Sequence, residues 1–440
     1  MEAFWCKFPL SMETNMTPDL LKRLIADQQE EGLPSPYFHR IAEKKLTILS
    51  KNKEIIILKG IRRCGKSVLL QLIRKKNKES AYYFNLEDER LIAFTVNDFQ
   101  LLQEVFIELY GIQKTYYFDE IQNIPNWERF VRRLYNDNNK IYITGSNASL
   151  FSKDLGTHLT GRYISMDVYP LSFFEFVLKQ DPKLVSEQIT STRQLGQIKK
   201  LFNHYCHVGG FPEYIKYENN DYMHSLYESI IYRDIISRYK ISNSKPLREL
   251  VYYLVSNCSK EITYNALRKL LQLGSATTVS DYCSYLEDSY LCFFVNRYDE
   301  SVKKQMQSPK KVYVIDHALA KFIGFHFSED QGRMLENIVF IELKRQGFDV
   351  YYHRGTKECD FLVRKNNQIV YAIQVCQQFS SEKVKQREQS GLLEALERHS
   401  LPIGYVLTER EEETVSLNYH NKRYQIITIP IWKWLLEFEK

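Results

Sequence analysis

The chain has 440 residues, of which 44% are hydrophobic and 26% are charged, and its formal net charge is +6. This composition supports packed cores and excludes a largely disordered chain, while the length allows two or three domains. The mild positive charge permits nucleic-acid binding without indicating it. No apolar run reaches the roughly 18 residues of a membrane span, so we expect no membrane partner. The N-terminus lacks a secretory pattern and the eight cysteines form no C-x-x-C pair, which favours a cytoplasmic protein without a zinc site.

A phosphate-binding loop is the first motif along the chain. Residues 60–67 read GIRRCGKS and fit the pattern G-x-x-x-x-G-K-[ST] at every fixed position. Gly60 and Gly65 permit the backbone angles and close approach that a triphosphate requires. Lys66 is expected to reach the β- and γ-phosphates, and Ser67 to ligate Mg²⁺. The predicted nucleotide-binding residues are Gly60, Ile61, Arg62, Arg63, Cys64, Gly65, Lys66, Ser67 and Val68.

The flanking residues supply the context that this motif requires. Residues 55–58 are a continuous β-branched and apolar run, which is typical of a strand buried on both faces. Residues 68–73 predict a helix, and three basic residues follow in its last turn. A bare match also fits a glycine turn between two elements, but the order strand, loop, helix favours a phosphate site.

Two acidic residues follow a second predicted strand at residues 115–118. Asp119 stands where an aspartate would hold Mg²⁺, most simply through water. Glu120 is the candidate to orient or deprotonate an attacking water molecule. Two adjacent acids after a strand also fit a solvated turn, but their place about fifty residues after the loop favours the catalytic interpretation.

A third predicted strand, residues 140–143, runs into the polar residues 144–147. Ligands of such sheets bind at the carboxyl ends of the strands, so Thr144 or Asn147 is a candidate sensor of the γ-phosphate or of the water. A polar turn with a helix cap is the alternative, and the two interpretations are compatible.

Several arginines are candidates to neutralise transition-state charge, within their own chain or in a neighbouring subunit. Three lie on the predicted helix 127–135, namely Arg129, Arg132 and Arg133, and Arg162 lies further on. The alternative for each is a solvated side chain, which we favour for Arg129.

Six stretches carry a family resemblance: residues 60–67, 118–128, 144–151, 161–176, 208–215 and 232–239. Together they resemble a family of bacterial and archaeal AAA-type ATPases with a C-terminal domain of unknown function. The resemblance covers nearly the whole chain and implies an AAA-like fold with ATP as the nucleotide. Arg162 matches the family's Gly-Arg position. Such ATPases often form rings, so the resemblance leaves a homo-oligomer open.

Three helices and a hairpin are predicted after residue 246. The helices are residues 247–257, 265–271 and 275–286, and the strands are residues 292–295 and 312–315. That order resembles a winged helix, in agreement with the family. A DNA-recognition helix normally brings cations to the phosphates, but residues 274–291 contain no Lys or Arg. We therefore favour packing or contact with a protein partner.

The hairpin loop keeps a nucleic-acid interpretation open. Its basic residues are Lys303, Lys304, Lys310 and Lys311, which would contact phosphates through the wing alone. A solvated, charged loop is the alternative.

The last part of the chain is similar to the PD-(D/E)xK nuclease fold, in which acids and a lysine bind Mg²⁺ and activate water. A helix at 336–346 and strands at 350–353, 358–363 and 369–376 carry the resemblance. Asp360 matches the first acid, Glu342 a helix acid and Gln374 the second acid, but Cys376 occupies the lysine position. A thiol supplies no fixed cation, so we expect a degenerate site, unless Lys383 or Lys385 reaches it.

We thus predict an α/β protein with four segments: an ATPase segment (residues 1–180), a lid segment (181–245), a middle segment (246–320) and a C-terminal segment (321–440). The ATPase segment is a P-loop AAA-like parallel sheet, the middle segment is winged-helix-like, and the C-terminal segment is restriction-endonuclease-like. The expected activity is Mg²⁺-dependent ATP hydrolysis coupled to the C-terminal modules. The alternatives are a nucleotide switch or scaffold with negligible turnover, and an ATP-regulated nuclease or DNA-binding protein.

Overall fold

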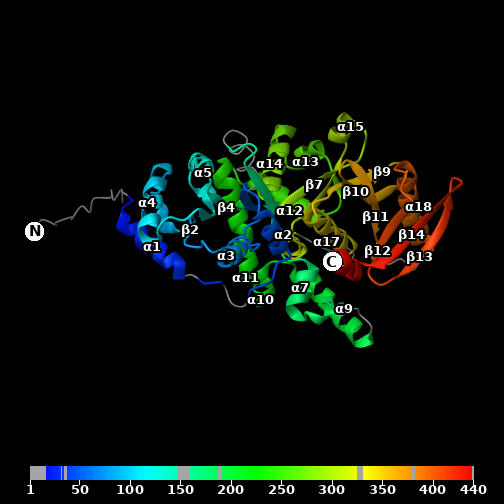
Figure 1. Cartoon of the computed structure of the whole chain (residues 1–440). Coiled ribbons are helices and arrows are strands. Elements are labelled where there is room, and N and C mark those ends of the chain that lie inside the picture. The colour runs from blue at the N-terminus through cyan, green and yellow to red at the C-terminus, as the bar shows by residue number, and fades with distance from the viewer. Residues whose placement is uncertain are drawn as a thin grey trace, which may run out of the picture.

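The structure is a computed structural model, which describes residues 16–30, 32–33, 37–146, 159–186, 191–324, 331–377 and 382–438. Its sheets have five, six and three strands. Figure 1 shows the five-stranded sheet near one end of the molecule and the six-stranded sheet at the other, with helices of the middle segment between them. Among the described helices, none has both the length and the apolar content that a membrane crossing requires.

The five-stranded sheet has the order β2-β3-β4-β1-β5, and all its pairings are parallel. Its strands are β1 (Ile55–Lys59), β2 (Tyr82–Asn85), β3 (Thr115–Asp119), β4 (Lys140–Gly145) and β5 (Tyr163–Asp167). The central strands are buried along nearly their whole length, as their apolar runs predicted. The fold is therefore the predicted α/β fold with a doubly covered parallel sheet.

Helices cover both faces of this sheet, because successive side chains on each strand point to opposite faces. Ile56 and Leu58 join a core with α2 (Ala42–Leu49) and α3 (Lys66–Lys76). Ile55 and Ile57 join a second core. The helices of that second core are α1 (Pro18–Glu30), α4 (Phe99–Tyr110) and α5 (Trp127–Asn136).

Helices make up the described part of the lid segment. They are α8 (Lys183–Ser186), α9 (Thr192–Val208), α10 (Pro212–Tyr217), α11 (Asn220–Glu228) and η4 (Ser229–Ser237), and they follow α7 (Phe173–Gln180). The element η4 is a π-helix, a rare form that often marks functional sites.

The middle segment contains the predicted three helices and hairpin. The helices are α12 (Lys245–Ser256), α13 (Tyr264–Leu270) and α14 (Ala276–Asp288), and the antiparallel sheet has the order β6 (Glu261–Ile262), β8 (Lys310–Val314), β7 (Cys292–Asn296). The connection between β7 and β8 is more ordered than the predicted loop, because it contains the short helix α15 (Val302–Gln307). The helix α16 (His317–Ile323) follows.

The C-terminal segment opens with the helix and the three strands that the sequence predicted: α17 (Gln331–Arg345), β9 (Asp349–Arg354), β10 (Glu358–Lys365) and β11 (Gln368–Val375). It continues with α18 (Glu382–Arg398), β12 (Ile403–Thr408), β13 (Glu413–Tyr419), β14 (Lys422–Pro430) and α19 (Ile431–Phe438). The sheet order is β13-β14-β12-β11-β10-β9, with parallel pairs between β11, β12 and β14.

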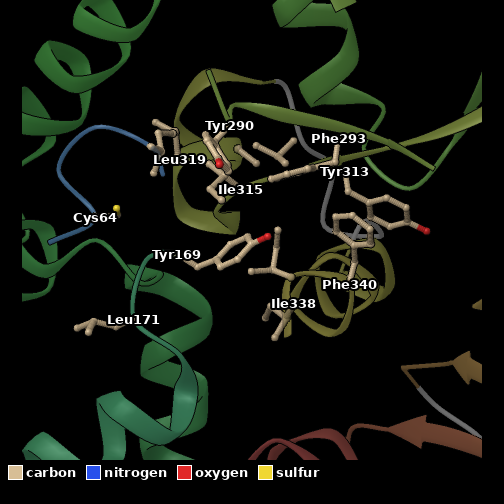
Figure 2. Packing of buried hydrophobic residues seen from close by; sticks show 14 of the residues in the cluster. Cys64, Tyr169, Leu171, Tyr290, Phe293, Tyr313, Ile315, Leu319, Ile338 and Phe340 are labelled. Atoms are coloured by element: carbon tan, nitrogen blue, oxygen red, sulfur yellow. The ribbon is translucent and has the colours of Figure 1, made fainter. Parts of the chain in front are cut away.

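One apolar core links the segments. In Figure 2, Tyr169 of the ATPase segment lies between Tyr290 of the middle segment and Ile338 of α17. Tyr313 stacks on Phe340 with ring centroids 4.2 Å apart, which joins β8 to α17. Buried aromatic contacts of this kind stabilise a packed boundary, so the middle segment packs against both the ATPase segment and the C-terminal segment.

Candidate functional site

The loop at residues 60–67 folds closely over the end of the sheet. A Cβ atom at Gly60 would lie 2.1 Å from the carbonyl oxygen of Val168, so only glycine fits there. Gly65 has φ of +99°, in the region that favours glycine, and it precedes the first turn of α3. Glycine is therefore required at position 60 by close packing and at position 65 by backbone conformation.

Arg40 holds this loop through its side chain, a role that no sequence motif indicated. Its Nη1 donates to the carbonyl oxygen of Cys64 at 2.7 Å and its Nη2 to that of Tyr169 at 2.6 Å. Its Nε lies 3.0 Å from Glu175 Oε1 in a buried ion pair. One guanidinium thus ties the loop to the chain after β5, which fixes the loop in place before any ligand binds.

Lys66 and Glu120 face each other across the loop. Lys66 Nζ donates to the carbonyl oxygen of Ile61 at 3.1 Å and lies 3.6 Å from Glu120 Oε1. Burial disfavours both charges, but each group stabilises the other, so the pKa of Lys66 is raised and that of Glu120 is lowered. Both groups are therefore charged at neutral pH. Glu120 also has φ of +50°, a strained conformation that is frequent at functional sites.

Asp119 lies beside this pair at the carboxyl end of β3. Thr144 at the end of β4 donates its hydroxyl to Asp119 Oδ1, and the backbone N–H of Glu120 donates to Thr144 Oγ1 at 2.9 Å. Burial and the Glu120 charge raise the pKa of Asp119 to about 6, although hydrogen bonds from Thr144 and Ser67 oppose the shift. A buried carboxylate next to a serine hydroxyl is a set of hard oxygen ligands, and it fits Mg²⁺.

A cavity of about 320 Å³ opens in front of these groups. Its lining includes Lys66, Ser67, Val68 and Glu120, together with residues from several other places in the chain. These residues include Tyr37 and Phe38 before α2, and Pro212, Glu213 and Lys216 of α10. The volume lies within the range of small-molecule sites, and the lid segment contributes to it directly.

Neither Asn147 nor Arg162, two of the predicted catalytic residues, is among the described residues that line this cavity. Asn147 lies outside the described residues. Arg162 lies before β5, where its carbonyl oxygen accepts from the N–H of Ile55 at the amino end of β1, whereas the phosphate loop follows the carboxyl end. The fold thus does not bring Arg162 to the loop of its own chain, and action in a neighbouring chain stays a prediction. The three arginines of α5, Arg129, Arg132 and Arg133, are exposed, and Arg133 donates to Gln100 at 2.7 Å.

Ion pairs join the phosphate loop to the lid segment. Arg62 contacts both carboxylate oxygens of Asp234 in η4, at 3.1 and 3.0 Å, and Glu87 at 2.7 Å. Arg233 also lies 2.7 Å from Glu87. The stretch around Tyr232 belonged to the family pattern, but the sequence did not indicate that it would meet Arg62.

The prediction that Lys311 contacts nucleic acid from the hairpin loop is wrong. It is only 2% exposed, so it is not a contact of the hairpin loop. Its Nζ lies 3.1 Å from Glu336, 2.8 Å from Glu358 and 2.9 Å from Asp360. The ammonium group donates to Glu336 and Asp360, and Glu358 completes the ion cluster, so three carboxylates compensate its charge. Lys303 and Lys304 are exposed on α15, and Lys310 is half-buried and donates to Asn296.

The predicted nuclease-like residues are only partly assembled. Gln374 donates to Asp360 at 2.8 Å and to Glu388 at 2.6 Å. The helix acid beside them is Glu336 and not Glu342, which the sequence predicted. Glu342 instead pairs with Arg345 at 3.0 Å. Cys376 packs in an apolar cluster with Leu392 and Val406. The suggested substitutes also point elsewhere, since Lys385 donates to Glu413 at 2.8 Å and Lys383 is exposed.

The predicted recognition helix α14 contacts the lid segment. Tyr239 stacks on Tyr285 with ring centroids 3.7 Å apart and donates to Asp288 at 2.9 Å. Burial raises the pKa of Glu287 on the same helix. An acidic helix that packs on a neighbour agrees with the packing role favoured by its sequence.

The parallel sheet, the phosphate loop and the acids at the strand ends define a P-loop protein of the AAA type. In agreement, a model described as "AAA domain" matches residues 52–177. "Domain of unknown function (DUF8612)" matches residues 199–328, and "Domain of unknown function (DUF4143)" matches residues 331–433.

Two curated proteins are similar to this chain over most of its length. The uncharacterized protein MJ1544 of Methanocaldococcus jannaschii is 33% identical over 435 residues, which cover 95% of this chain and 96% of that protein. An uncharacterized protein of Haemophilus influenzae is 32% identical and covers 72% of this chain and 81% of its own length. The chain belongs to the family of these proteins, which has an AAA-type ATPase domain followed here by two domains of unknown function.

Among solved structures, Cdc6p from Pyrobaculum aerophilum is 13% identical and covers 67% of this chain and 96% of its own. Its TM-score of 0.26 is too low to support a conclusion about this chain.

Proposed function

We propose that the chain binds ATP with Mg²⁺ in the cavity beside the phosphate loop and hydrolyses it. The observation that carries this proposal is that Lys66, Ser67 and Glu120 line one cavity of about 320 Å³, with Asp119 buried directly beside them. They come from the carboxyl ends of β1 and β3, where parallel sheets place their ligands.

Each group has a chemical role in this proposal. Lys66 places its charge against the β- and γ-phosphates, and the loop N–H groups surround them. Ser67 and Asp119 would hold Mg²⁺, which supplies charge neutralisation when it is bound. Glu120 would orient the attacking water and accept its proton. Arg40 keeps the loop in position through its two backbone contacts.

Nucleotide state would reach the rest of the molecule through the lid segment. Pro212 and Glu213 of α10 line the cavity, and Asp234 of η4 pairs with the loop. Just after η4, Tyr239 stacks on α14 of the middle segment. A movement of the lid would therefore move the middle segment, which we propose is a winged-helix-like packing module rather than a DNA reader.

The C-terminal segment would act as an interaction module with a nuclease-like fold. Lys311 donates to Glu336 and Asp360 and forms an ion pair with Glu358, so the acids of the nuclease-like cluster already compensate its charge. This arrangement supports a structural role for the cluster.

A slow nucleotide switch is the second candidate, and the state of Glu120 favours it. Its carboxylate accepts from Gln122 and lies 3.6 Å from Lys66, and these contacts lower its pKa, which makes it a weaker acceptor of a proton from water. Such a site would bind ATP well and turn over slowly.

Binding and turnover of ATP by the full chain test both candidates. Lys66→Ala should weaken ATP binding or turnover by about 10²–10³-fold, as expected for loss of a charge that contacts the reacting phosphate. Lys304→Ala on α15 is the matched control and should leave both unchanged. Equal ATP binding and hydrolysis in wild type and Lys66→Ala would refute the site. Tight binding with a single slow turnover would select the switch.

A further inference from the structure

Arg62 of the phosphate loop forms ion pairs with two carboxylates of its own chain. Arg62 is the third residue of the loop, it lines the cavity, and its side chain is 12% exposed. It makes two charge-assisted bonds to Asp234 and one to Glu87. Bidentate contacts of this kind are the stronger and more directional class of ion pair. A loop side chain that should favour phosphate is thus already engaged by carboxylates.

Resting on the proposed function, we propose that Arg62 is shared between Asp234 and the nucleotide, so that Asp234 is a positioning residue that opposes nucleotide binding. A triphosphate in the cavity would compete with Asp234 for the same guanidinium donors. Binding would then weaken the contact between the phosphate loop and η4 and would release that part of the lid.

Asp234 needs a substitute partner for this exchange, because a buried carboxylate left alone is costly. Arg238 lies one turn further along the chain, and within the part of the chain that the structure describes its buried Nη1 has no hydrogen-bond partner. Burial lowers the pKa of Arg238 while the Asp234 charge opposes this, so the two groups are within electrostatic reach. Arg238 can therefore replace Arg62 as the ion-pair partner of Asp234.

The residues Asp234 and Arg238 lie in and next to the π-helix η4. In a π-helix the turns are wider than in an α-helix, and single π turns are frequent at functional sites. Here the form extends over nine residues that include Asp234, and it ends next to Arg238. Arg233 of η4 pairs with Glu87, which also pairs with Arg62, so η4, the phosphate loop and the loop after β2 share one charge network.

The experiment measures the affinity of the full chain for a fluorescent ATP analogue. Asp234→Asn keeps the shape but removes the charge, and should tighten ATP binding by about tenfold, a typical size for coupled groups. In an Arg62→Met background the same change should have no effect, because the gain acts through Arg62. Asp349→Asn is the matched control, since it removes a two-bond contact with Arg364 in the C-terminal sheet.

Each outcome has a defined meaning. Weaker or unchanged ATP binding in Asp234→Asn would overturn the proposal, because a pair that only supports the loop cannot compete with the ligand. Equal tightening with and without Arg62 would also overturn it. If wild type binds ATP, Lys66→Ala does not, and Asp234→Asn equals wild type, then only this inference fails. If wild type binds no ATP, the proposed function fails and the inference fails with it.

Discussion

Two buried lysine–carboxylate clusters lie in this chain, and they differ in how the lysine is used. Among the described residues, Lys66 donates to Ile61 and has Glu120 at 3.6 Å beside a cavity. Lys311 has three carboxylates within 3.1 Å. The first lysine lies beside a cavity that a phosphate could enter, whereas the charge of the second is already compensated by three carboxylates. Residue types alone therefore do not make a site, because the charge must also be accessible to a ligand.

The sharpest test of the first cluster is Glu120→Gln. The amide keeps the size of the side chain but cannot accept a proton, so ATP hydrolysis should fall by about 10²–10⁴-fold. Nucleotide binding should persist, since Lys66 and the loop are intact. Single-turnover assays measure the loss, with Asp360→Asn of the second cluster as the matched control. Turnover near wild type in Glu120→Gln would assign the base to another residue.

The second cluster should respond in stability rather than in turnover. Lys311→Met leaves Glu336 and Asp360 buried without their cation, which should reduce the free energy of unfolding by about 3–5 kcal/mol. Urea titration measures this, and Lys304→Met on the exposed helix α15 should stay within about 0.5 kcal/mol of wild type. Burial and the Asp360 charge raise the pKa of Glu336 to about 7, so the loss should shrink as the pH falls from 8 to 6. An unchanged stability in Lys311→Met would make the cluster irrelevant to folding.

A pH series gives the smallest effect and separates activity from stability. The pKa of Asp119 is raised to about 6, so this group becomes protonated below that pH and loses its value as a metal ligand. Turnover at saturating ATP should fall about tenfold between pH 7 and pH 5. The stability contribution has the opposite sign, because the folded state binds a proton that the unfolded state lacks between about pH 4 and 6.

The difference between wild type and Asp119→Asn isolates the stability part of this prediction. The variant cannot titrate, so wild type should gain unfolding free energy relative to it as the pH falls from 6 to 4. A flat activity profile down to pH 5 would show that Asp119 stays charged in the working enzyme.

Local patterns predicted the fold well where each element is defined by its own residues. The run at 55–58 is apolar because β1 is covered on both faces, and the helix after the loop begins at Lys66. The phosphate loop was found by the same means, since its glycines and lysine occupy consecutive positions. What could be predicted was thus short-range in sequence.

The contacts that decide function join residues far apart in sequence. Arg62 and Asp234 are 172 positions apart, and Lys311 and Asp360 are 49 apart. A weak signal did exist for Lys311, because Lys310 and Lys311 are adjacent in a strand and must face opposite sides. Glu336 and Glu342 likewise lie six positions apart on one helix, so they face different directions and only one could join Asp360.

The shared apolar core in Figure 2 has a practical consequence for anyone cutting the gene into fragments. A fragment that ends after residue 180 would leave Tyr169 and Leu171 without the neighbours that bury them from the middle segment and α17. It would carry a complete phosphate loop together with a newly exposed apolar surface, which favours aggregation. Nucleotide chemistry in this family is therefore best measured on uncut chains.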